Sequence, residues 1–500
     1  MARSRRISMP TKESYDDHVI RLFLLAAAVW GVVGMSIGVL AAAQMAWPAL
    51  NFDISWLTFS RIRANHTFGV IFGFGGSALM GTCYYIVQHT GHVRLAFGRL
   101  ALFTFWGWQA VIVLAMATMP FGITQAKEYA EPEWFIDLLI AVVWVAFGVV
   151  FFGTLARRRI RHIYVSNWYF GALIIAVALL HIVNNLALPV SLTKSYTIYS
   201  GAVDAMVQWW YGHNAVAFFL TGGFLGMMYY FVPRQAQQPL WSYRFSIVNF
   251  WALISVYMWA GSHHLLYTAL PDWVQSVGMV FSLVLLMPSL GSAANGLLTF
   301  NGSWDKVRTD PAAKFMVLAL VFYAASTFEG SMMAIKSVNS LTHYTDWTVA
   351  HVHSGAIGWV AMITIGSLYA MAPRALDRPA MHSVPAMNLH FWLHTAGLLL
   401  YIVSMWAAGV TEGLMWRATS ADGSLTHDFL SSLIAVQPYY LGRLLGGVLV
   451  LSGMVVMAWN LWRTAAHART EVIKPILVPV PEAIPEPVPD QYPPPLPAKS

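Results

Sequence analysis

The chain has 500 residues, of which 58% are hydrophobic and only 10% are charged. This composition is typical of a protein that crosses the membrane many times. The formal net charge of +7 does not indicate a nucleic-acid partner, because the basic residues are spread among the predicted loops. Cys83 is the single cysteine, which excludes internal disulfides, iron–sulfur clusters, thiolate zinc sites and covalent c-type haem in this chain.

Twelve apolar segments are long enough to cross the bilayer, so we expect an all-α polytopic membrane protein with twelve transmembrane helices. The segments lie near 21–46, 62–87, 98–120, 134–155, 167–190, 206–232, 242–270, 273–299, 313–335, 347–372, 387–408 and 440–462. The N-terminus, the even-numbered loops and the C-terminus carry most of the Lys and Arg. The positive-inside rule therefore predicts that both termini face the cytoplasm. No internal repeat is evident.

The chain divides into three parts. Residues 1–19 form a basic and polar cytoplasmic segment, residues 20–465 form the membrane domain, and residues 466–500 form a tail. Ten of the 24 prolines lie in 474–500. Because proline cannot continue a helix, we expect this tail to be extended and disordered.

Six histidines fall at one depth of the predicted topology, in the outer third of the bilayer. They come from four segments and are His66, His213, His263, His264, His351 and His353. Ionisable groups inside a membrane are costly and are usually functional, so the cluster indicates a metal site. His181 and His394 lie in other segments without such neighbours, and we interpret them as packing residues.

Spacing divides the six histidines into groups. His351 and His353 are two residues apart, a rotation of about 200° on a helix, so they leave from opposite sides of one rod. Neutral imidazole is a usual axial ligand of haem iron, and one helix can thus serve two haems. His263 and His264, joined by His213, can form a three-nitrogen site that suits copper, zinc or iron.

Three ordered motifs connect the sequence to a known family. They are Gln208-Trp209-Trp210-Tyr211-Gly212-His213-Asn214-Ala215-Val216, Ser262-His263-His264-Leu265-Leu266-Tyr267 and Asp346-Trp347-Thr348-Val349-Ala350-His351-Val352-His353-Ser354-Gly355. With them the chain resembles the catalytic subunit I of the C-family, cbb-type haem–copper cytochrome c oxidases. The resemblance extends from the first predicted span to the twelfth and implies the haem–copper oxidase subunit I fold.

The resemblance implies a role for each histidine. His66 and His353 would bind the low-spin haem b, and His351 would bind the high-spin haem, also of b type. His213, His263 and His264 would hold the copper ion, CuB. Tyr257 matches the active-site tyrosine that the family links covalently to the copper ligand corresponding to His213. Helical spacing permits this link, because Tyr257 lies seven residues before His264 and hence on nearly the same face.

Further residues acquire expected roles from the same resemblance. Glu329 would accept a hydrogen bond from the far nitrogen of His351 and so raise its basicity. Glu128 matches a position that contributes to a calcium site near the haem propionates, which makes calcium a candidate further ion. Arg63 and Arg443 lie at the same outer level and are candidate propionate partners, as is His343 on the loop before the tenth span.

A proton route is predicted between the cytoplasm and the site. Ser246, Tyr257 and Tyr323 match the single proton channel of the family. Asn295 and Thr299 lie on the eighth predicted span and are added because their side chains can extend a polar relay. Protons drawn from the cytoplasm to a site near the outer face would cross most of the membrane potential.

The resemblance also implies the reaction and the partners. The enzyme would reduce O2 to water at a haem b/CuB binuclear centre, coupled to proton uptake and pumping across the bacterial inner membrane. Electrons would come from membrane-anchored monohaem and dihaem c-type cytochrome subunits, with soluble cytochrome c as the upstream donor. The chain itself would contact the lipid bilayer and no nucleic acid.

Two other functions are weighed against the oxidase. Nitric oxide reductase shares the six-histidine plan with non-haem iron in place of copper, but places a glutamate one turn after the histidine of the sixth span. Ala217 stands there and Tyr257 is present, which favours the oxidase. A histidine-rich membrane transporter would show broken helices and repeated halves, and neither is clear in the sequence.

Overall fold

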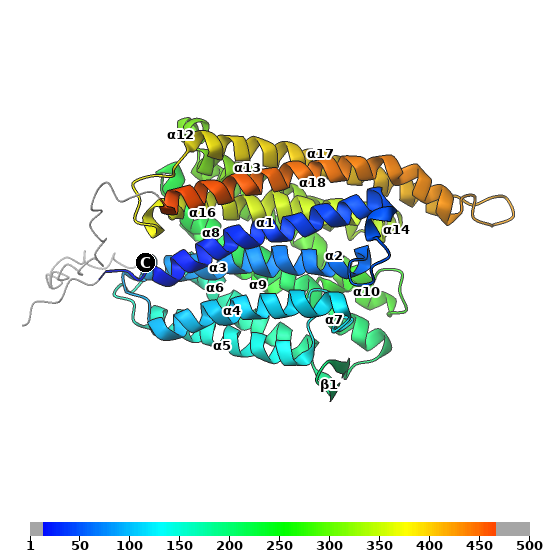
Figure 1. The fold of residues 1–500 in the computed structure, drawn as a ribbon, viewed down its shortest axis with the longest axis horizontal. Helices are drawn as coiled ribbons and strands as arrows, with labels where there is room; N and C mark the ends of the chain where they lie inside the picture. Colours follow the sequence, from blue (N-terminus) through cyan, green and yellow to red (C-terminus); the bar gives the residue numbers. More distant parts are fainter. Residues whose placement is uncertain (1–13, 467–500) are drawn as a thin grey trace, which may run out of the picture.

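Twelve membrane-length helical spans run side by side in the computed structural model, which describes residues 14–466 (Figure 1). In chain order the spans are α1 (His18–Ala46), α2–α3 (Phe59–Gly91), α4 (Gly98–Thr118, continued by a 3-10 turn to Phe121), α5 (Trp134–Ala156), α6 (Val165–Asn184), α7–α8 (Gly201–Ala236), α9 (Tyr243–Tyr257, with a 3-10 turn to Leu265), α10–α11 (Asp272–Thr299), α13 (Pro311–Met333), α15–α16 (Asp346–Ala375), α17 (Val384–Arg417) and α18 (Phe429–Ala466). The prediction of an all-α, twelve-span membrane protein is confirmed.

Short elements connect or interrupt the spans. The helices within and between spans are α2 (Phe59–Phe68), α3 (Ser77–Gly91), α7 (Gly201–Ala215), α8 (Phe224–Ala236), α10 (Asp272–Val284), α11 (Leu286–Thr299), α12 (Trp304–Thr309), α14 (Lys336–Thr342), α15 (Asp346–His353) and α16 (Met362–Ala375). A 3-10 turn at Pro48–Asn51 follows α1. An antiparallel hairpin of β1 (Ala187–Ser191) and β2 (Lys194–Thr197) joins α6 to α7. The described chain begins and ends at the same end of the bundle, called here the terminal end (Figure 1).

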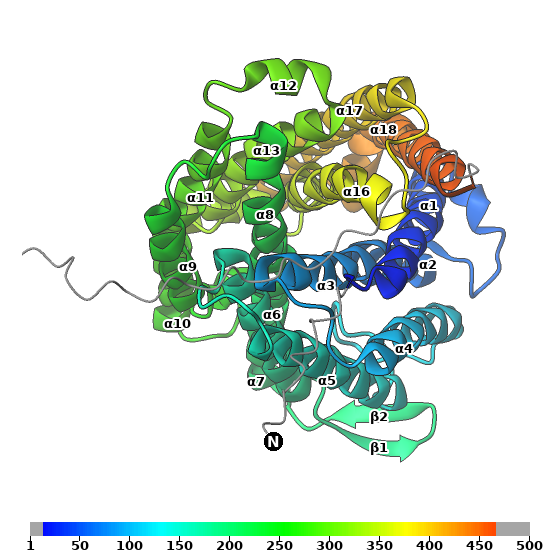
Figure 2. The same cartoon turned by 90° about the vertical axis from the view of Figure 1, so that its left-hand side faces the viewer.

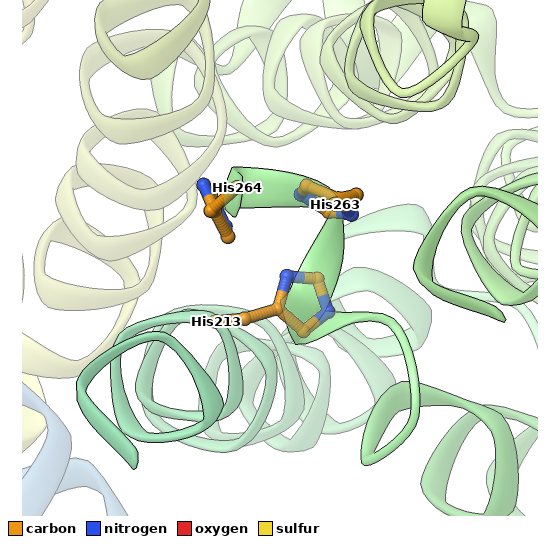
Figure 3. A group of neighbouring side chains, drawn as sticks. All are labelled: His213, His263 and His264. Atoms are coloured by element: carbon orange, nitrogen blue, oxygen red, sulfur yellow. The ribbon is translucent and has the colours of Figure 1, made fainter. Parts of the chain in front are cut away.

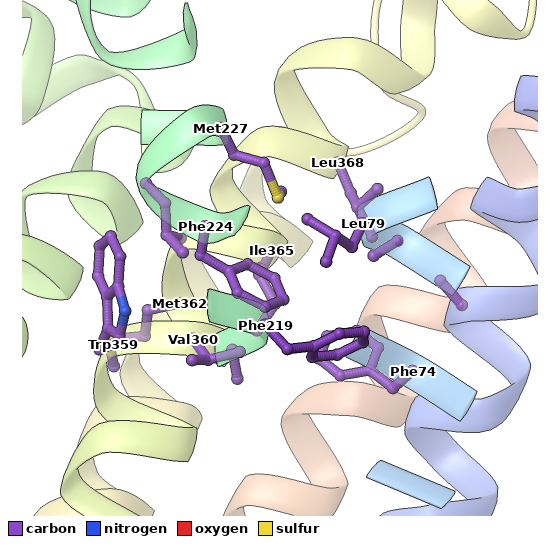
Figure 4. Close-up of a cluster of buried hydrophobic side chains, with 14 of the residues drawn as sticks. Phe74, Leu79, Phe219, Phe224, Met227, Trp359, Val360, Met362, Ile365 and Leu368 are labelled. Carbon is purple, nitrogen blue, oxygen red and sulfur yellow. The ribbon is translucent and has the colours of Figure 1, made fainter. Parts of the chain in front are cut away.

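Three of the spans form the inside of the bundle. In α2–α3, α7–α8 and α15–α16, 83% of the most apolar stretch is buried, against 33–56% in the other spans. Figure 2, viewed along the bundle from the terminal end, shows α3, α8 and α16 inside the ring that the other helices form. Where they meet, Leu79, Phe219 and Phe224 pack with Trp359 and Ile365 in a continuous apolar core (Figure 4).

Each inner span contains a π-helical segment, and each segment begins three residues after a histidine. The segments are Gly69–Gly76, Val216–Gly223 and Ser354–Ala361, which follow His66, His213 and His351. A π-segment frees backbone carbonyls from regular bonding, and side chains from neighbouring spans bond to these carbonyls. Trp108 donates to the Phe72 oxygen at 3.0 Å and Trp359 to the Leu220 oxygen at 3.2 Å.

A second repeated contact lies at the terminal end. Just before the third, seventh and eleventh spans, a backbone N–H donates to a threonine. The threonine lies near the end of the fourth, eighth or twelfth span, respectively. The three pairs are Ala96 with Thr154, Trp241 with Thr299 and His382 with Thr464, at 3.0–3.1 Å. The bundle is therefore built from three similar arcs of four spans each. The first arc runs from α1 to α5, the second from α6 to α11 and the third from α13 to α18. The repeat was not evident in the sequence, because packing contacts and not residue identities are repeated.

The seventh and eighth spans differ from the continuous helices expected for 242–270 and 273–299. The α-helix α9 ends at Tyr257, and His263 and His264 stand on a separate 3-10 turn, Gly261–Leu265. The eighth span is interrupted at Leu285. Pro288 explains this interruption, because a proline cannot bond to the carbonyl four residues earlier and its ring clashes with it.

The last two spans are longer than predicted. Apolar runs at 387–408 and 440–462 lie within α17 and α18, which extend as an antiparallel pair beyond the bundle at the end opposite the termini (Figure 1). Hydropathy marks only the part that fits a membrane, and helical structure continues past it. The predicted tail at 466–500 lies, apart from Ala466, outside the described residues.

Candidate metal and haem centre

Three imidazoles, those of His213, His263 and His264, lie close together between the helices (Figure 3). His213 comes from α7, while His263 and His264 come from the 3-10 turn after α9. Their ring centroids lie 4.2–5.6 Å apart. One ligand atom from each ring falls within 4.8 Å of the others, a spacing that a single metal ion can bridge.

Neighbouring groups fix two of these rings. Nδ1 of His263 donates to Oγ of Ser282 at 2.6 Å, and that hydroxyl donates in turn to the Gly278 carbonyl. The Nε2 atom of His263 is therefore left for a ligand. His264 stacks on Trp209 with centroids 4.3 Å apart. Nε2 of His213 is buried without a hydrogen-bond partner among the described groups. An orphaned buried nitrogen beside two more imidazoles fits a copper, zinc or iron ion.

Tyr257 lies beside this group, although the reason first given for its position is wrong. Its ring centroid is 5.7 Å from that of His213. Tyr257 and His264 do not share a helical face, because the α-helix ends at Tyr257 and the histidines follow on a separate 3-10 turn. Tyr257 is the last residue of α9 and its ring lies next to His213, and the 3-10 turn that follows packs against α7.

His351 on α15 is anchored by Glu329 of α13. Its Nδ1 lies 3.4 Å from the Glu329 carboxylate. The same carboxylate accepts hydrogen bonds from the indoles of Trp347 and Trp406 at 2.9 and 2.5 Å, and from Ser354 at 3.3 Å. A buried carboxylate is stable here because several donors surround it. The side chain of His351 is 29% exposed although it lies inside the bundle, so protein does not cover the whole ring.

His66 and His353 are anchored by backbone oxygens. Nδ1 of His66 bonds to the Gly34 carbonyl and Nδ1 of His353 to the Val349 carbonyl, both at 2.8 Å. Both rings retain surface that protein does not cover. A Cβ on Gly38 of α1 would lie 2.5 Å from the His66 ring, so the close approach of α1 requires glycine there. Nε2 of His353 lies 3.3 Å from the Tyr401 hydroxyl.

The four polar residues expected near the propionates are separated into an exposed and a buried group. Arg63 pairs with Glu128 at 3.2 Å on the surface. Arg443 is largely buried and faces Asp346 at 3.9 Å. Partial burial lowers the pKa of His343, which lies in the loop before α15 and stacks on Tyr344, so His343 is neutral at pH 7.

Asp346, a residue that the sequence argument left without a role, begins α15 and thus orients the helix that carries both His351 and His353. Its backbone N–H donates to the carboxylate of Glu412 at 2.7 Å. Trp209, Ser282, Trp406 and Glu412 were likewise not predicted as site residues. The Trp209 position is part of a motif quoted for the resemblance, whereas Ser282 and Glu412 reach the site only through packing, which leaves no local pattern.

The residues of the predicted proton route lie on α9 and α11 of the second arc and on α13, the first span of the third arc. Tyr257 neighbours Thr221 and Ser289, and Ser289 also neighbours Tyr323. The hydroxyls of Ser289 and Tyr323 are buried without a hydrogen-bond partner in the described part of the chain. Nearer the terminal end, Ser246 is fully buried and donates to the Tyr243 carbonyl at 2.6 Å.

Asn295 and Thr299, which were predicted to extend the proton route, lie at the end of α11 and are hydrogen-bonded to backbone. Both amide atoms of Asn295 bond to the backbone of Ser242, at 3.0 and 3.1 Å. Thr299 accepts from Trp241 and donates to the Asn295 carbonyl. These contacts fasten α11 to the start of α9. Neither side chain is free to relay protons, so we interpret both as structural.

An apolar cavity lies among α5, α6 and the inner spans α2–α3 and α7–α8. Phe72, Tyr129 and Val177 line its inner part, and it ends against Ala215 and Val216 next to His213. Trp144, Val145 and Ile182 line its outer part. No sequence pattern indicated this cavity, because ordinary apolar residues from different spans form it.

Comparison with known proteins places this architecture in a family. The model of the family "Cytochrome C and Quinol oxidase polypeptide I" matches residues 18–449. The chain is 59% identical over 459 residues to the Cbb3-type cytochrome c oxidase subunit CcoN1 of Stutzerimonas stutzeri, covering 92% of this chain and 97% of the relative. It is 54% identical to cytochrome c oxidase subunit 1 of Rhodobacter capsulatus, covering 91% and 87% of the two chains.

More distant proteins share the fold. A nitric oxide reductase subunit of Stutzerimonas stutzeri is 23% identical, covering 82% of this chain and 87% of the relative. A solved haem–copper terminal oxidase dimer aligns with a TM-score of 0.75 at 15% identity, over 91% of this chain and 85% of that one. Both the extent of the family match and the identity to the cbb3-type relative confirm the predicted resemblance. The chain belongs to the cytochrome c and quinol oxidase polypeptide I family, the catalytic subunits of the haem–copper oxidases.

Proposed function

We propose that this chain reduces O2 to water as the catalytic subunit of a cbb3-type cytochrome c oxidase. The observation that carries the proposal is the group of three imidazoles from His213, His263 and His264, with Tyr257 beside it, in a chain 59% identical to a cbb3-type subunit. The family requires haems and copper. This chain holds two haems, one low-spin and one high-spin, and both are of b type.

Each histidine has one assigned ligand role. His213, His263 and His264 hold copper, and His351 holds the high-spin haem. His66 and His353 hold the low-spin haem. The anchoring contacts support this assignment, because Nδ1 of His66, His263, His351 and His353 already faces a hydrogen-bond partner. Nε2 is then the nitrogen that meets the metal. For His353, this requires its ring to leave the Tyr401 hydroxyl.

The protein supplies orientation, charge and protons to these cofactors. When bound, the haems and copper bind the oxygen molecule and supply electrons. Glu329 keeps the Nδ1 proton of His351 in place, and its negative charge raises the basicity of that imidazole. Ser282 fixes the tautomer of His263. Tyr257 is placed to give its hydroxyl proton to the site, since its ring lies next to His213.

Protons reach Tyr257 between the second arc and α13. We assign the relay to Ser246, Tyr323, Ser289 and Tyr257, and leave out Asn295 because its amide is bound to backbone. The buried hydroxyls of Ser289 and Tyr323 without protein partners support this route, because buried polar groups of this kind are usually satisfied by water. Oxygen, an apolar molecule, enters through the cavity that ends at Ala215 and Val216.

The remaining assignments complete the complex. The protein lies in the bacterial inner membrane with the terminal end in the cytoplasm, as the loop charges indicate. Monohaem and dihaem c-type cytochrome subunits anchored in the membrane deliver electrons from soluble cytochrome c. Glu128, with Arg63 beside it, contributes to a calcium site near the propionates. Arg443 and His343 are the other propionate partners.

Purification of the complex in detergent tests the proposal. We expect two b-type haems per chain, one of them reactive with carbon monoxide, one copper ion, and oxygen consumption with reduced cytochrome c. Non-haem iron in place of copper, with nitric oxide consumption, would instead identify a nitric oxide reductase. Absence of haem would overturn both functions.

Tyr323→Phe tests the relay within the complex. Removing the hydroxyl interrupts the hydrogen-bonded route, so turnover should fall at least tenfold while the haem and copper spectra remain unchanged. Thr82→Val on α3 is the control, because the Thr82 hydroxyl is also fully buried but bonds only to carbonyls of its own helix. Unaltered turnover in Tyr323→Phe would exclude this route.

A further inference from the structure

The second and third arcs place different side chains at equivalent positions. The seventh span begins after the cap Ser242 and the eleventh after the cap Ser383, and each cap serine accepts a hydrogen bond from the N–H three residues on. Asn460 binds the backbone of Ser383 with both amide atoms, at 2.8 and 3.0 Å, as Asn295 does for Ser242. The two arcs are therefore in the same register at the terminal end.

Seven residues beyond each cap, a polar side chain meets a buried tyrosine of the inner span. In the second arc, Asn249 neighbours Tyr229. In the third arc, Nδ1 of His390 lies 2.9 Å from the hydroxyl of Tyr369. Each tyrosine is followed four residues later by Pro-Arg, at 233–234 and 373–374. The third arc thus carries a histidine where the second carries an amide.

The first arc has the same arrangement without an ionisable partner. Seven residues beyond its cap Phe97 stands Thr104, whose hydroxyl lies 3.0 Å from that of Tyr84. Four residues further along is Trp108, which donates to the Phe72 carbonyl in the first π-segment. The equivalent of Trp108 in the third arc is His394, and its Nε2 lies 3.4 Å from the Ile357 carbonyl in the third π-segment. Trp108 makes this contact without a titratable group, and the second arc has Leu253 at the same position, so the fold does not require a histidine there.

His390 and His394 form a fully buried pair on one face of α17. Both are 0% exposed, and their ring centroids are 5.6 Å apart. Nε2 of His390 and Nδ1 of His394 have no hydrogen-bond partner among the described residues. The hydrogen bonds at the other two ring nitrogens make one of these atoms a proton donor and the other a proton acceptor. If Nδ1 of His390 accepts from Tyr369, its Nε2 carries a proton. If Nε2 of His394 donates to Ile357, its Nδ1 is a free acceptor.

We propose that Tyr369, His390 and His394 form a second proton relay, which holds one proton from the terminal end when an electron reaches the low-spin haem. The upper end of the relay supports this destination, because Ile357 lies four residues after His353 on the same span. The inference rests on the proposed function, since it requires a haem at His66 and His353.

The proton step involves only N–H and O–H bonds. A proton arriving at the Tyr369 oxygen releases the hydroxyl proton to Nδ1 of His390, which becomes an imidazolium. Its Nε2 proton then passes to Nδ1 of His394, by rotation of a ring or through one water molecule. The charge stays on His394 while the haem holds its extra electron, and the proton leaves when the electron moves on. The oxidase reaction supplies the electron.

The surroundings of the pair favour this coupling. Phe315 of α13 packs against both rings, with centroids 5.0 and 6.1 Å away, and Gly453 of α18 lies against His390. Tyr369 of α16 is the ionisable group that bonds to the pair. Lys314, next to Phe315, bonds to Asn388 at 2.7 Å on the terminal side. In such apolar surroundings a cation is costly unless a compensating negative charge arrives nearby.

Optical redox titration of the low-spin haem in the complete complex tests the inference. A proton taken up with the electron makes reduction more favourable as pH falls, approaching a tenfold change in the reduction equilibrium per pH unit. We expect this dependence in the wild type. His390→Asn, which copies the side chain of the second arc, and His394→Asn, which retains an N–H donor, should make it at least twofold shallower.

Tyr84→Phe is the matched control, since it removes the equivalent hydroxyl in the first arc and should leave the wild-type pH dependence unchanged. Infrared difference spectra of histidine-labelled wild-type enzyme provide a readout that needs no variant, and should show an imidazole becoming protonated on reduction. Unchanged pH dependence in both histidine variants, or no imidazole signal in the wild type, would overturn the relay. A wild-type complex without a low-spin haem would instead overturn the proposed function.

Discussion

The two halves of the histidine site hold their rings in different ways. One half is proposed to hold copper and the high-spin haem. There, His263 is anchored by the side chain of Ser282 and His351 by that of Glu329. On the low-spin side, His66 and His353 are anchored by the carbonyls of Gly34 and Val349. A side-chain anchor can supply charge and tune its imidazole, whereas a carbonyl fixes orientation with little variation. The side proposed for oxygen chemistry thus has the adjustable anchors, and the side proposed for electron transfer has the fixed ones.

Removing a metal ligand should have the largest effect. His213→Ala deletes one of three nitrogens and should abolish copper binding and oxygen consumption. The low-spin haem spectrum should persist, because its anchors lie on other elements. Metal analysis and optical spectra measure both results. Intact copper content would show that the three imidazoles do not form the copper site.

Changing the charged anchor should have the next largest effect. Glu329→Gln keeps the size of the side chain but loses the negative charge beside His351. We expect turnover to fall about 10–100-fold, the usual range for such supporting groups, with a shifted high-spin haem spectrum. Glu412→Gln is the comparison, because Glu412 is similarly buried but bonds to a backbone N–H. Equal losses in the two variants would mean that carboxylates near α15 act only through folding.

Placing a larger residue against His66 should affect the low-spin haem. In Gly38→Ala, the new Cβ would lie 2.5 Å from the His66 ring, so α1 or the ring must shift. We expect a changed low-spin haem spectrum with unaltered copper content. Gly447→Ala on α18 has room for a methyl group and should resemble the wild type. A normal low-spin spectrum in Gly38→Ala would show that His66 does not depend on this close approach.

Removing the neutral anchor should have the smallest effect. Ser282→Ala leaves Nδ1 of His263 without its partner, at a cost of about 1–3 kcal/mol for a buried donor. We expect weaker copper retention during dialysis against a chelator, and a modest loss of turnover. Ser282→Thr should restore much of both. Copper retention equal to that of the wild type would indicate that His263 is oriented by packing with His213 and His264.

Sequence reasoning was strongest where one span carries its own signal. The twelve spans were predicted because membrane thickness sets the length of an apolar helix. The meeting of His213 with His263 and His264 was anticipated from topology alone, since all three fell at one depth. The face of Tyr257 was argued wrongly, because hydropathy does not reveal that α9 ends there. The parts of α17 and α18 that extend beyond the apolar runs at 387–408 and 440–462 were not predicted, because hydropathy does not mark where a helix ends.

Contacts between distant spans were outside the reach of sequence reasoning. Asn295 was predicted as part of a polar route and is instead bound to the Ser242 backbone. His394 was interpreted as a packing residue, and its ring nitrogen lies against the Ile357 carbonyl of another span. In each case the side chain alone permits several roles, and the neighbour that decides among them lies 53 and 37 residues away, respectively.

The three π-segments have a consequence for how this chain can tolerate insertions and deletions. Each gives one inner span a local excess of backbone between its histidine and its tyrosine end. Loss of one residue from Val216–Gly223 would remove this excess, so that the segment could become regular α-helix with the residues beyond it on nearly the same faces. Gain of one residue would instead turn everything beyond it by about 100° relative to His213, and Tyr229 would face away from Asn249. These three sites should therefore tolerate the loss of a single residue better than the gain of one.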